Sequence, residues 1–195
     1  HLKHHQSAGT IDDPDAPNYQ AYPISRTSLK RKVIRDLTGQ LGWRRIKSIY
    51  RGVSRMNELK PEVREYMIRS IGVNLVLLAI LTAFGHAWLY LVWILAFMTS
   101  HMLVVRIRQI GEHAGVPNLL DQDPRQNTRT LYLNPLERFL IAPHQVSYHL
   151  EHHMLASVPI YRLRTLHNML LNKGYYQDIK FQHGYFNLLK NVTYA

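Results

Sequence analysis

Residues 70–105 read SIGVNLVLLAILTAFGHAWLYLVWILAFMTSHMLVV and contain no Asp, Glu, Lys or Arg. One unbroken α-helix of this length would measure about 54 Å, whereas the hydrocarbon core of a bilayer is about 30 Å thick. The stretch must therefore fold back on itself, and Gly85 and His86 near its middle form the natural turn. We predict a transmembrane hairpin over residues 66–105, with arms at residues 66–84 and 87–105.

Basic residues flank this hairpin on both sides. Arg64 and Arg69 precede the apolar stretch, and Arg106 and Arg108 follow it. Since cytoplasmic loops of membrane proteins carry an excess of Lys and Arg, both open ends are expected on the cytoplasmic side. The chain is thus predicted to be an integral, multi-pass membrane protein whose segments before and after the hairpin share one compartment.

The segment before the hairpin is strongly basic. Between Arg26 and Arg69 there are 13 Lys and Arg residues against four acids, and the whole chain has a formal net charge of +11. Apolar residues recur there at roughly helical intervals, with an interruption near Gly39 and Gly42. This pattern is typical of basic amphipathic helices in a membrane interface, which we predict for residues 26–65. A nucleic-acid partner is not expected, because the segment lacks a recognisable binding motif and interleaved stacking aromatic residues.

The pattern His-x-x-His-His occurs twice, once on each side of the hairpin. Side chains at positions i, i+3 and i+4 of a helix share one face, so each cluster can direct its imidazoles at a common point. The chain has 12 His and no Cys, which excludes disulfides and thiolate metal sites. Grouped imidazoles suit iron better than a thiolate-preferring ion, and the alternative is a set of coincidentally spaced structural histidines. The candidate ligands are His1, His4, His5, His149, His152 and His153.

Three carboxylates follow the first cluster closely. Asp12, Asp13 and Asp15 are near enough to orient its imidazoles through hydrogen bonds, a common role of carboxylates beside ligating histidines. The alternative is that they serve the turn around Pro14.

Other histidines lie closer to the hairpin. His113 follows its end by two helical turns and is a further candidate ligand, with a purely structural role as the alternative. His86 and His101 lie within the apolar stretch, and we do not assign them as ligands.

The last third of the chain is expected to be helical in parts. Residues 119–130 are rich in Asp, Asn and Pro and indicate an irregular loop. The apolar residues 131–143 predict another interfacial helix, which delivers the second cluster. Pro159 indicates the start of a further helix, with Leu163, Leu166 and Leu170 as its apolar stripe and Gly174 as its end.

The order of these features resembles the membrane fatty acid desaturase family, and the resemblance covers nearly the whole chain. It implies an all-α integral membrane protein with a transmembrane helical hairpin and a cytosolic helical cap that carries histidine boxes. The single domain of residues 1–195 would comprise the second box and its exit loop (1–25), the basic helices (26–65), the hairpin (66–105) and the cap with the third box (106–195). The resemblance rests on His1-Leu-Lys-His4-His5, Asp13-Pro14-Asp15, Glu112-His113, Asn127-Thr-Arg129-Thr130, His149-Leu-Glu-His152-His153 and Val158-Pro159.

The resemblance also implies a ligand set. The second box of the family falls on His1, His4 and His5, the third falls on His149, His152 and His153, and His113 matches an additional ligand. These residues would hold two non-haem iron ions. The family's first box has no match here, so we expect that the chain is N-terminally incomplete and that this piece alone can be inactive.

The implied activity is the O2-dependent introduction of a double bond into an acyl chain. Lipid or acyl substrates, and ferredoxin or a cytochrome b5-type protein as electron donor, are the implied partners, and the basic surface between Arg26 and Arg69 is a candidate dock for the donor. A carotenoid ketolase or hydroxylase, or an alkane or sphingolipid hydroxylase, would share the same boxes. Outside the enzymes, the alternative is a His-rich membrane protein that binds metal or haem.

Overall fold

The computed structural model describes residues 2–195, and His1 lies outside the described part. The chain is mostly helical, as predicted, and its described part also contains four two-residue strands that the sequence analysis did not predict. It divides into two compact units. Unit 1 comprises residues 1–30 and 104–195, and unit 2 comprises residues 31–103.

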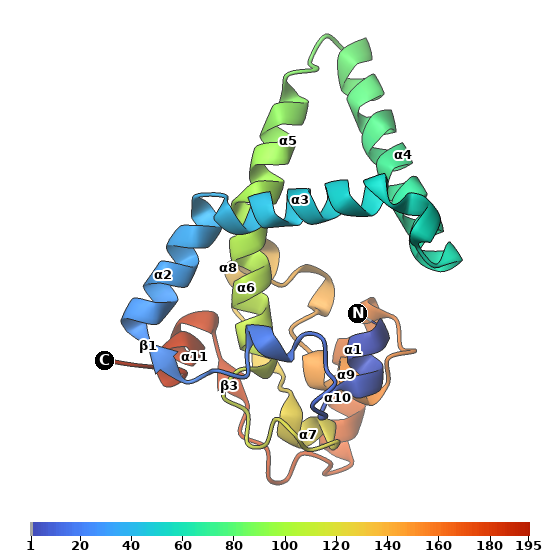
Figure 1. The fold of residues 1–195 in the computed structure, drawn as a ribbon. Helices are drawn as coiled ribbons and strands as arrows, with labels where there is room; N and C mark the ends of the chain where they lie inside the picture. The colour runs from blue at the N-terminus through green and yellow to red at the C-terminus, as the bar shows by residue number, and fades with distance from the viewer. Residues whose placement is uncertain (1) are drawn as a thin grey trace. The chain divides into compact units, whose positions relative to one another are not determined.

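Unit 2 holds the basic helices and the apolar hairpin (Figure 1). Helix α2 spans Arg26–Leu37 and helix α3 spans Gln40–Ser54. The chain breaks between them at Gly39, whose φ of 76° is accessible to glycine at little cost. Helices therefore form where the basic pattern predicts them, whereas their position in a membrane interface stays a prediction. A 3-10 turn, η2 (Met56–Glu58), leads to α4.

The apolar stretch folds back as predicted. Helix α4 (Pro61–Ala83) and helix α5 (Leu89–Met98) are joined by a turn in which Gly85 has a φ of 75°. The second arm differs from the prediction in two ways: it is interrupted at Thr99, and its continuation α6 (Ser100–His113) runs beyond residue 105. Hydroxyl groups explain the break, because Thr99 and Ser100 donate hydrogen bonds to the carbonyls of Leu95 (2.6 Å) and Ala96 (3.2 Å) within the helix.

The hairpin has the length and composition of membrane spans. Residues Pro61–Ala83 and Leu89–His113 are each long and apolar enough to cross a bilayer. The side-chain amide in α4 is satisfied: Asn74 accepts hydrogen bonds from the Tyr90 hydroxyl (3.2 Å) and the Trp93 indole (3.3 Å) and donates to the Ser70 carbonyl. These bonds also connect α4 to α5, so a polar group that would be costly in lipid instead joins the two helices.

Replacement of Gly42 by alanine is expected to disrupt the close crossing of α3 over α5. The added Cβ would lie 2.3 Å from the carbonyl oxygen of Met98, a backbone atom that cannot rotate away. Overpacking of this kind costs about 1–3 kcal/mol. Gly72→Ala in α4 is the matched control, since nothing lies within 4 Å of its Cβ position. Thermal unfolding in detergent compares the two variants, and equal melting temperatures would contradict the crossing.

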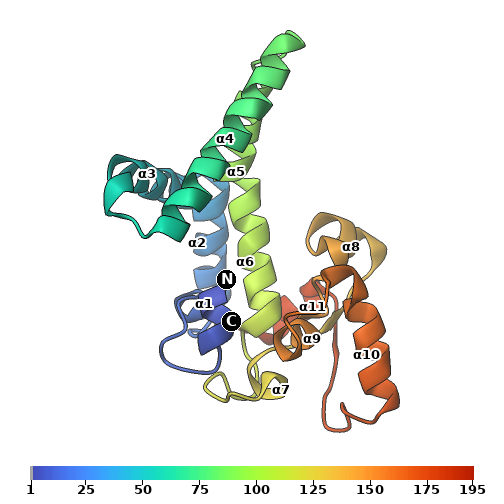
Figure 2. The ribbon, with the colours of Figure 1, turned by 90° about the vertical axis from the view of Figure 1, so that its right-hand side faces the viewer.

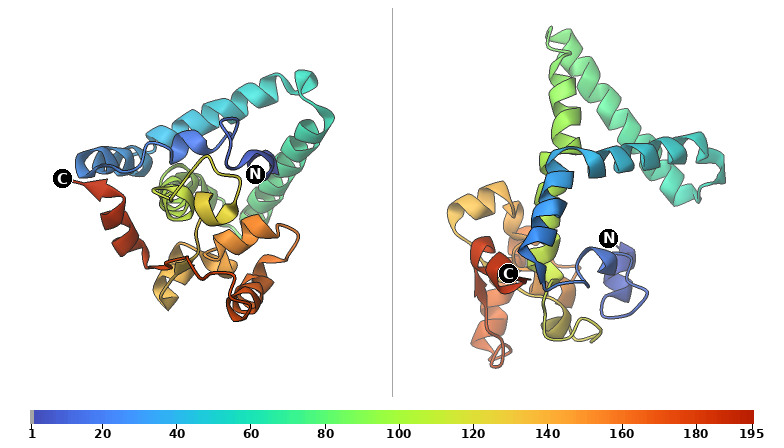
Figure 3. Two further views of the ribbon diagram at one scale, coloured as in Figure 1. Left: turned by 90° about the horizontal axis from the view of Figure 1, so that it is seen from below. Right: turned by 60° about the vertical axis from the view of Figure 1, so that its left-hand side comes forward.

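Unit 1 is built around the end of α6. Seen end-on in the left view of Figure 3, the yellow-green α6 lies between the N-terminal segment and the orange and red C-terminal helices. Two parallel strand pairs, β1 with β4 and β2 with β3, connect the beginning and middle of the chain to its end. The buried core includes Ile110, Ala114, Leu131, Tyr185 and Leu188. The remaining elements are α1 (Leu2–Ser7), η1 (Ala16–Asn18), β1 (Ile24–Ser25), α7 (Pro124–Asn127), β2 (Leu131–Tyr132), α8 (Pro135–Leu140), η3 (Pro143–Gln145), α9 (His149–Met154), η4 (Ile160–Arg162), α10 (Leu163–Asn172), β3 (Gln182–His183), α11 (Tyr185–Asn191) and β4 (Thr193–Tyr194).

The prediction of a helix over residues 131–143 is wrong in extent. The helix covers only Pro135–Leu140, because Leu131 and Tyr132 pair with β3 and Asn134 starts the helix through a reciprocal capping box with Glu137. The loop at residues 119–130 contains the single helical turn α7. Helix α10 confirms the stripe of leucines, and Gly174 follows its end with a φ of 71°.

Candidate metal centre

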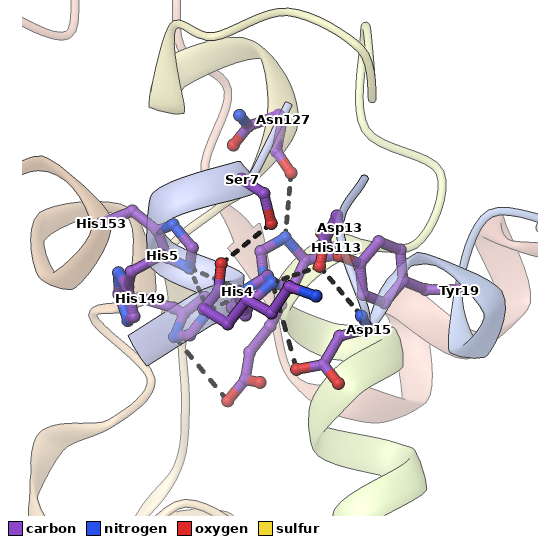
Figure 4. A network of polar contacts seen from close by, with 12 residues as sticks. His4, His5, Ser7, Asp13, Asp15, Tyr19, His113, Asn127, His149 and His153 are labelled. Atoms are coloured by element: carbon purple, nitrogen blue, oxygen red, sulfur yellow. Dashed lines mark hydrogen bonds and ion pairs between the residues drawn. The ribbon is translucent and has the colours of Figure 1, made fainter. Parts of the chain in front are cut away.

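Four histidines from three separate helices meet inside unit 1. His4 of α1, His113 at the end of α6, and His149 and His153 of α9 each place one ring nitrogen within 4.8 Å of all the others. Their imidazoles are turned toward one another (Figure 4). The Nε2 atoms of His113 and His149, and those of His149 and His153, are 3.0 Å apart. The structure thus brings together the two predicted histidine boxes and His113.

The other two described box histidines form a separate pair. The Nε2 atoms of His5 and His152 approach to 2.9 Å, and the His5 ring stacks on His153 with 4.3 Å between ring centroids. The pair therefore lies directly beside the four-His cluster. Consecutive helical residues project about 100° apart, which lets the adjacent histidines of each box enter different groups instead of the common point predicted for each box. His1, the remaining predicted ligand, lies outside the described residues.

The orientation of the rings fits a bound cation. The Nδ1 of His113 is 3.0 Å from the carbonyl oxygen of Asn127, and the Nδ1 of His4 is 2.8 Å from the carboxylate of Asp13. Because these oxygens only accept hydrogen bonds, both Nδ1 atoms must be donors. In its neutral form each ring then directs the lone pair of its Nε2 into the cluster. Nε2 lone pairs that converge in this way can coordinate a cation, and the donor set matches a transition metal that prefers imidazole.

The surroundings keep the α9 imidazoles neutral. Burial, together with neighbouring imidazoles, lowers the pKa of His153 to about 2 and holds the pKa of His149 well below its usual value. Burial and the nearby His152 lower the pKa of His5 to about 4. A metal ligand must be deprotonated, and these rings therefore offer free nitrogen lone pairs at neutral pH.

Asp13 holds His4 in its orientation. Its carboxylate accepts hydrogen bonds from His4 Nδ1, from the hydroxyl of Tyr19 and from the backbone N–H of Asp15 (2.9 Å). Tyr19 in turn stacks on the ring of His113, with centroids 4.7 Å apart. The orienting role predicted for the three carboxylates is confirmed for Asp13. Asp15 lies 4.0 Å from His4 Nδ1, and Asp12 is exposed.

Replacement of Asp13 by asparagine is expected to weaken metal binding about 10–100-fold, the usual cost of losing a hydrogen-bonded partner behind a ligating histidine. The amide keeps the size of the side chain but removes the charge that fixes the His4 tautomer. Asp12→Asn is the matched control, one residue away and exposed. Competition with a chromophoric chelator measures both affinities, and equal values would contradict the role of Asp13.

A second buried network lies on the opposite side of α9. Glu151 is fully buried and accepts hydrogen bonds from His167 Nδ1 (2.6 Å), the Tyr176 hydroxyl (2.5 Å) and the Thr130 hydroxyl. Burial alone would raise the pKa of Glu151, but these three donors hold it below its usual value. The network extends to Tyr132, whose hydroxyl is 2.8 Å from the Nε2 of His167. The network fixes the helix that carries three of the box histidines.

Sequence reasoning missed this network. In the sequence, Glu151 is only one of the two residues between His149 and His152. His167 and Tyr176 belong to no motif that would identify them as its partners. The only signal is positional: Glu151 lies two residues after His149, on the helix face away from the cluster. His86 and His101, which we did not assign as ligands, do not belong to the four-His cluster.

A cavity of about 160 Å³ opens beside the four-His cluster. His4, His113 and His149 line one side, and Arg108 and Glu112, which form an ion pair at 3.0 Å, line another. Glu112 also lies 3.9 Å from His149 Nδ1. The cluster therefore borders a cavity that is partly lined by charged side chains.

Comparison with known proteins agrees with this geometry. The family model described as "Fatty acid desaturase" matches residues 1–185. Neither a search of curated proteins nor a search of solved structures gave a significant match. The matched region contains both histidine boxes, His113, and the Asp13 and Glu151 networks, and the chain belongs to the fatty acid desaturase family.

Proposed function

We propose that the chain is an O2-dependent membrane di-iron desaturase that introduces a double bond into an acyl chain. Family membership supports an oxidoreductase of the desaturase or hydroxylase type. The observation that carries the proposal is the convergence of four imidazoles from three helices, with one ring nitrogen of each within 4.8 Å of the others, beside a second imidazole pair.

Within this proposal the two histidine groups have separate roles. His4, His113, His149 and His153 would hold one iron, and His5 and His152 would contribute to a second, with His1 as a further ligand implied by the resemblance. Two irons at adjacent sites, when bound, supply the activation of O2 that an unreactive methylene C–H bond requires. Asp13 and the Asn127 carbonyl hold the rings of His4 and His113 in the tautomer that binds metal.

The reaction balances with an external reductant. Removal of two hydrogens from –CH2–CH2– releases two electrons and two protons, a donor provides two more electrons, and two further protons come from solvent. Together these reduce one O2 to two waters. A ferredoxin or a cytochrome b5-type protein fits the donor role, since the Lys and Arg of α2 and α3 offer a complementary surface to an acidic partner.

The apolar hairpin supports a location in the membrane. Helices α4 and α5 expose many large aliphatic side chains, among them Leu75 at 60% and Leu91 at 69%. Such surfaces need lipid or protein around them. We propose that the hairpin of residues 66–105, within the two candidate helices Pro61–Ala83 and Leu89–His113, spans the bilayer, with the histidine groups on the cytoplasmic side.

Elemental analysis and product analysis test the proposal on protein expressed from its native reading frame and purified in detergent. We expect about two irons per chain, and an unsaturated product from acyl substrates that forms only with O2 and a reduced donor. A hydroxylated product would place the chain among the hydroxylases of the family. Zinc in place of iron, or a haem Soret band, would overturn the proposal in favour of a metal- or haem-binding protein.

A further inference from the structure

The chain at the end of α7 packs against the C-terminal end of α6, where His113 lies. Figures 1 and 2 show α7 just beyond that end of the helix. The carbonyl of Asn127 accepts the hydrogen bond from His113 Nδ1. The carbonyl of Glu112 accepts two more, from the Thr128 hydroxyl and from the Arg129 backbone N–H, both at 3.2 Å. The segment thus satisfies a terminal carbonyl of α6 and fixes the ring of His113.

The side chain of Arg129 adds a positive charge at the same place. Its guanidinium donates a hydrogen bond to the carbonyl of Ala114, the fully buried residue directly after His113. Burial lowers the pKa of Arg129 to about 10, so the group is still charged at neutral pH but poorly solvated. Among the described residues 2–195, no carboxylate forms an ion pair with it.

The cap of α6 does not require this charge. A neutral side-chain amide can donate the same hydrogen bond to the Ala114 carbonyl, and a buried charge that lacks a partner costs more than a neutral group. The interaction of a cation with the C-terminal end of a helix offsets part of this cost. Since arginine is seldom buried without a carboxylate partner, the charge of Arg129 indicates a role beyond the cap.

The other charges beside the four-His cluster are paired or negative. Arg108 and Glu112 neutralise each other in the ion pair at 3.0 Å. The two carboxylates described above lie on the side of His4, at 2.8 and 4.0 Å from its Nδ1. The cluster therefore has negative charge behind His4 and the positive charge of Arg129 behind His113.

We propose that Arg129 acts on the metal centre through its charge. In the interior of a protein, a fixed cation raises the energy of a nearby positive ion in proportion to the charge of that ion. Arg129 thus lowers the affinity of the four-His cluster for cations and favours Fe2+ over Fe3+, which makes the iron easier for a donor to reduce. The inference rests on the metal binding proposed above.

The sign of the effect separates this role from a purely positional one. If Arg129 only held His113 in place, its replacement would loosen a ligand and weaken metal binding. If its charge acts on the metal, a neutral replacement strengthens metal binding instead. Asp13→Asn, which removes a negative charge, is expected to change the affinity in the opposite direction.

Co2+ is the probe, because it binds imidazole and stays divalent. Arg129→Gln removes the charge and keeps a hydrogen-bond donor, Arg129→Met removes both, and Arg129→Lys keeps the charge. Arg125→Gln is the matched control, from the same segment but exposed and paired with Asp123 at 2.6 Å. Co2+ is titrated at pH 7 into the metal-free full chain in detergent, in competition with a chromophoric chelator. His149→Ala shows which binding belongs to the four-His cluster.

We expect Arg129→Gln and Arg129→Met to bind Co2+ about tenfold more tightly than the wild type, or about threefold per unit of ionic charge. Arg129→Lys and Arg125→Gln should bind like the wild type. In iron-loaded Arg129→Gln, the ratio of Fe3+ to Fe2+ affinity should rise about threefold, which lowers the one-electron potential by about 28 mV.

Weaker Co2+ binding in both neutral variants, or loss of their fold by circular dichroism, would show that Arg129 only positions His113 and would overturn the inference. Unchanged affinity in both would overturn it too, as would equally tight binding by Arg129→Lys. In these cases the metal centre itself stands. If His149→Ala binds Co2+ like the wild type, or neither binds it, the metal centre fails and this inference fails with it.

Discussion

Replacement of His149 by alanine is expected to remove desaturation below detection and to lower iron affinity more than about 100-fold, beyond the 10–100-fold cost of losing a residue behind a ligand. His149 lies at the centre of the four-His cluster, because its Nε2 is 3.0 Å from the Nε2 atoms of both His113 and His153. It is also almost fully buried, so water cannot enter easily to replace the lost nitrogen. Iron per chain and product yield measure the effect.

The matched control is His101→Ala. His101 is an exposed histidine in α6 that stacks on Phe97 and lies outside the cluster. We expect it to keep both iron and activity. Circular dichroism and size-exclusion chromatography of His149→Ala separate loss of metal from loss of fold. Full iron content in His149→Ala would contradict the assignment of the cluster as a metal site.

Replacement of Glu151 by alanine is expected to destabilise unit 1 by about 3–5 kcal/mol, the cost of breaking a buried charged network by removing one partner. His167, Tyr176 and Thr130 would all lose their acceptor at once. Since Glu151 is fully buried, solvent cannot replace it. Hydrogen exchange of the α9 amides in detergent measures the opening free energy, and iron affinity is expected to fall together with it.

Two variants test whether the network acts as a unit. Tyr176→Phe removes one of the three donors and should cost about 1.5–3 kcal/mol, the range for a hydrogen bond to a charged group. Glu62→Ala, an exposed acid at the start of α4, should have little effect on α9. Unchanged exchange in Glu151→Ala would contradict the network's role in holding α9.

Long periodic segments were the part of the fold that sequence alone could predict. The hairpin, its turn at Gly85 and the leucine stripe of α10 follow from apolar spacing and glycine conformations that depend on few neighbours. The break at Thr99 and the short extent of α8 depend on local hydrogen bonds and on pairing with distant residues 182–183, which spacing does not reveal.

The candidate site was predictable in composition but not in arrangement. Repetition of the box identified six histidines, of which His4, His5, His149, His152 and His153 are brought together in the described part. The anchoring of α9 was not predictable, because Glu151 finds His167 and Tyr176 in segments that show no motif of their own. Tertiary contacts alone distinguish these residues from ordinary polar side chains.

The division of each box between two histidine groups has a mechanical consequence. His4 and His5 are linked by one peptide bond, as are His152 and His153, yet members of each couple face different groups. A translation or rotation of α1 or α9 therefore displaces ligands of both groups simultaneously. Neither group can be retuned alone by moving α1 or α9. Changes confined to one group must come from α6, which carries only His113 of the four-His cluster, or from residues outside the boxes, such as Arg108 and Glu112 beside the cavity.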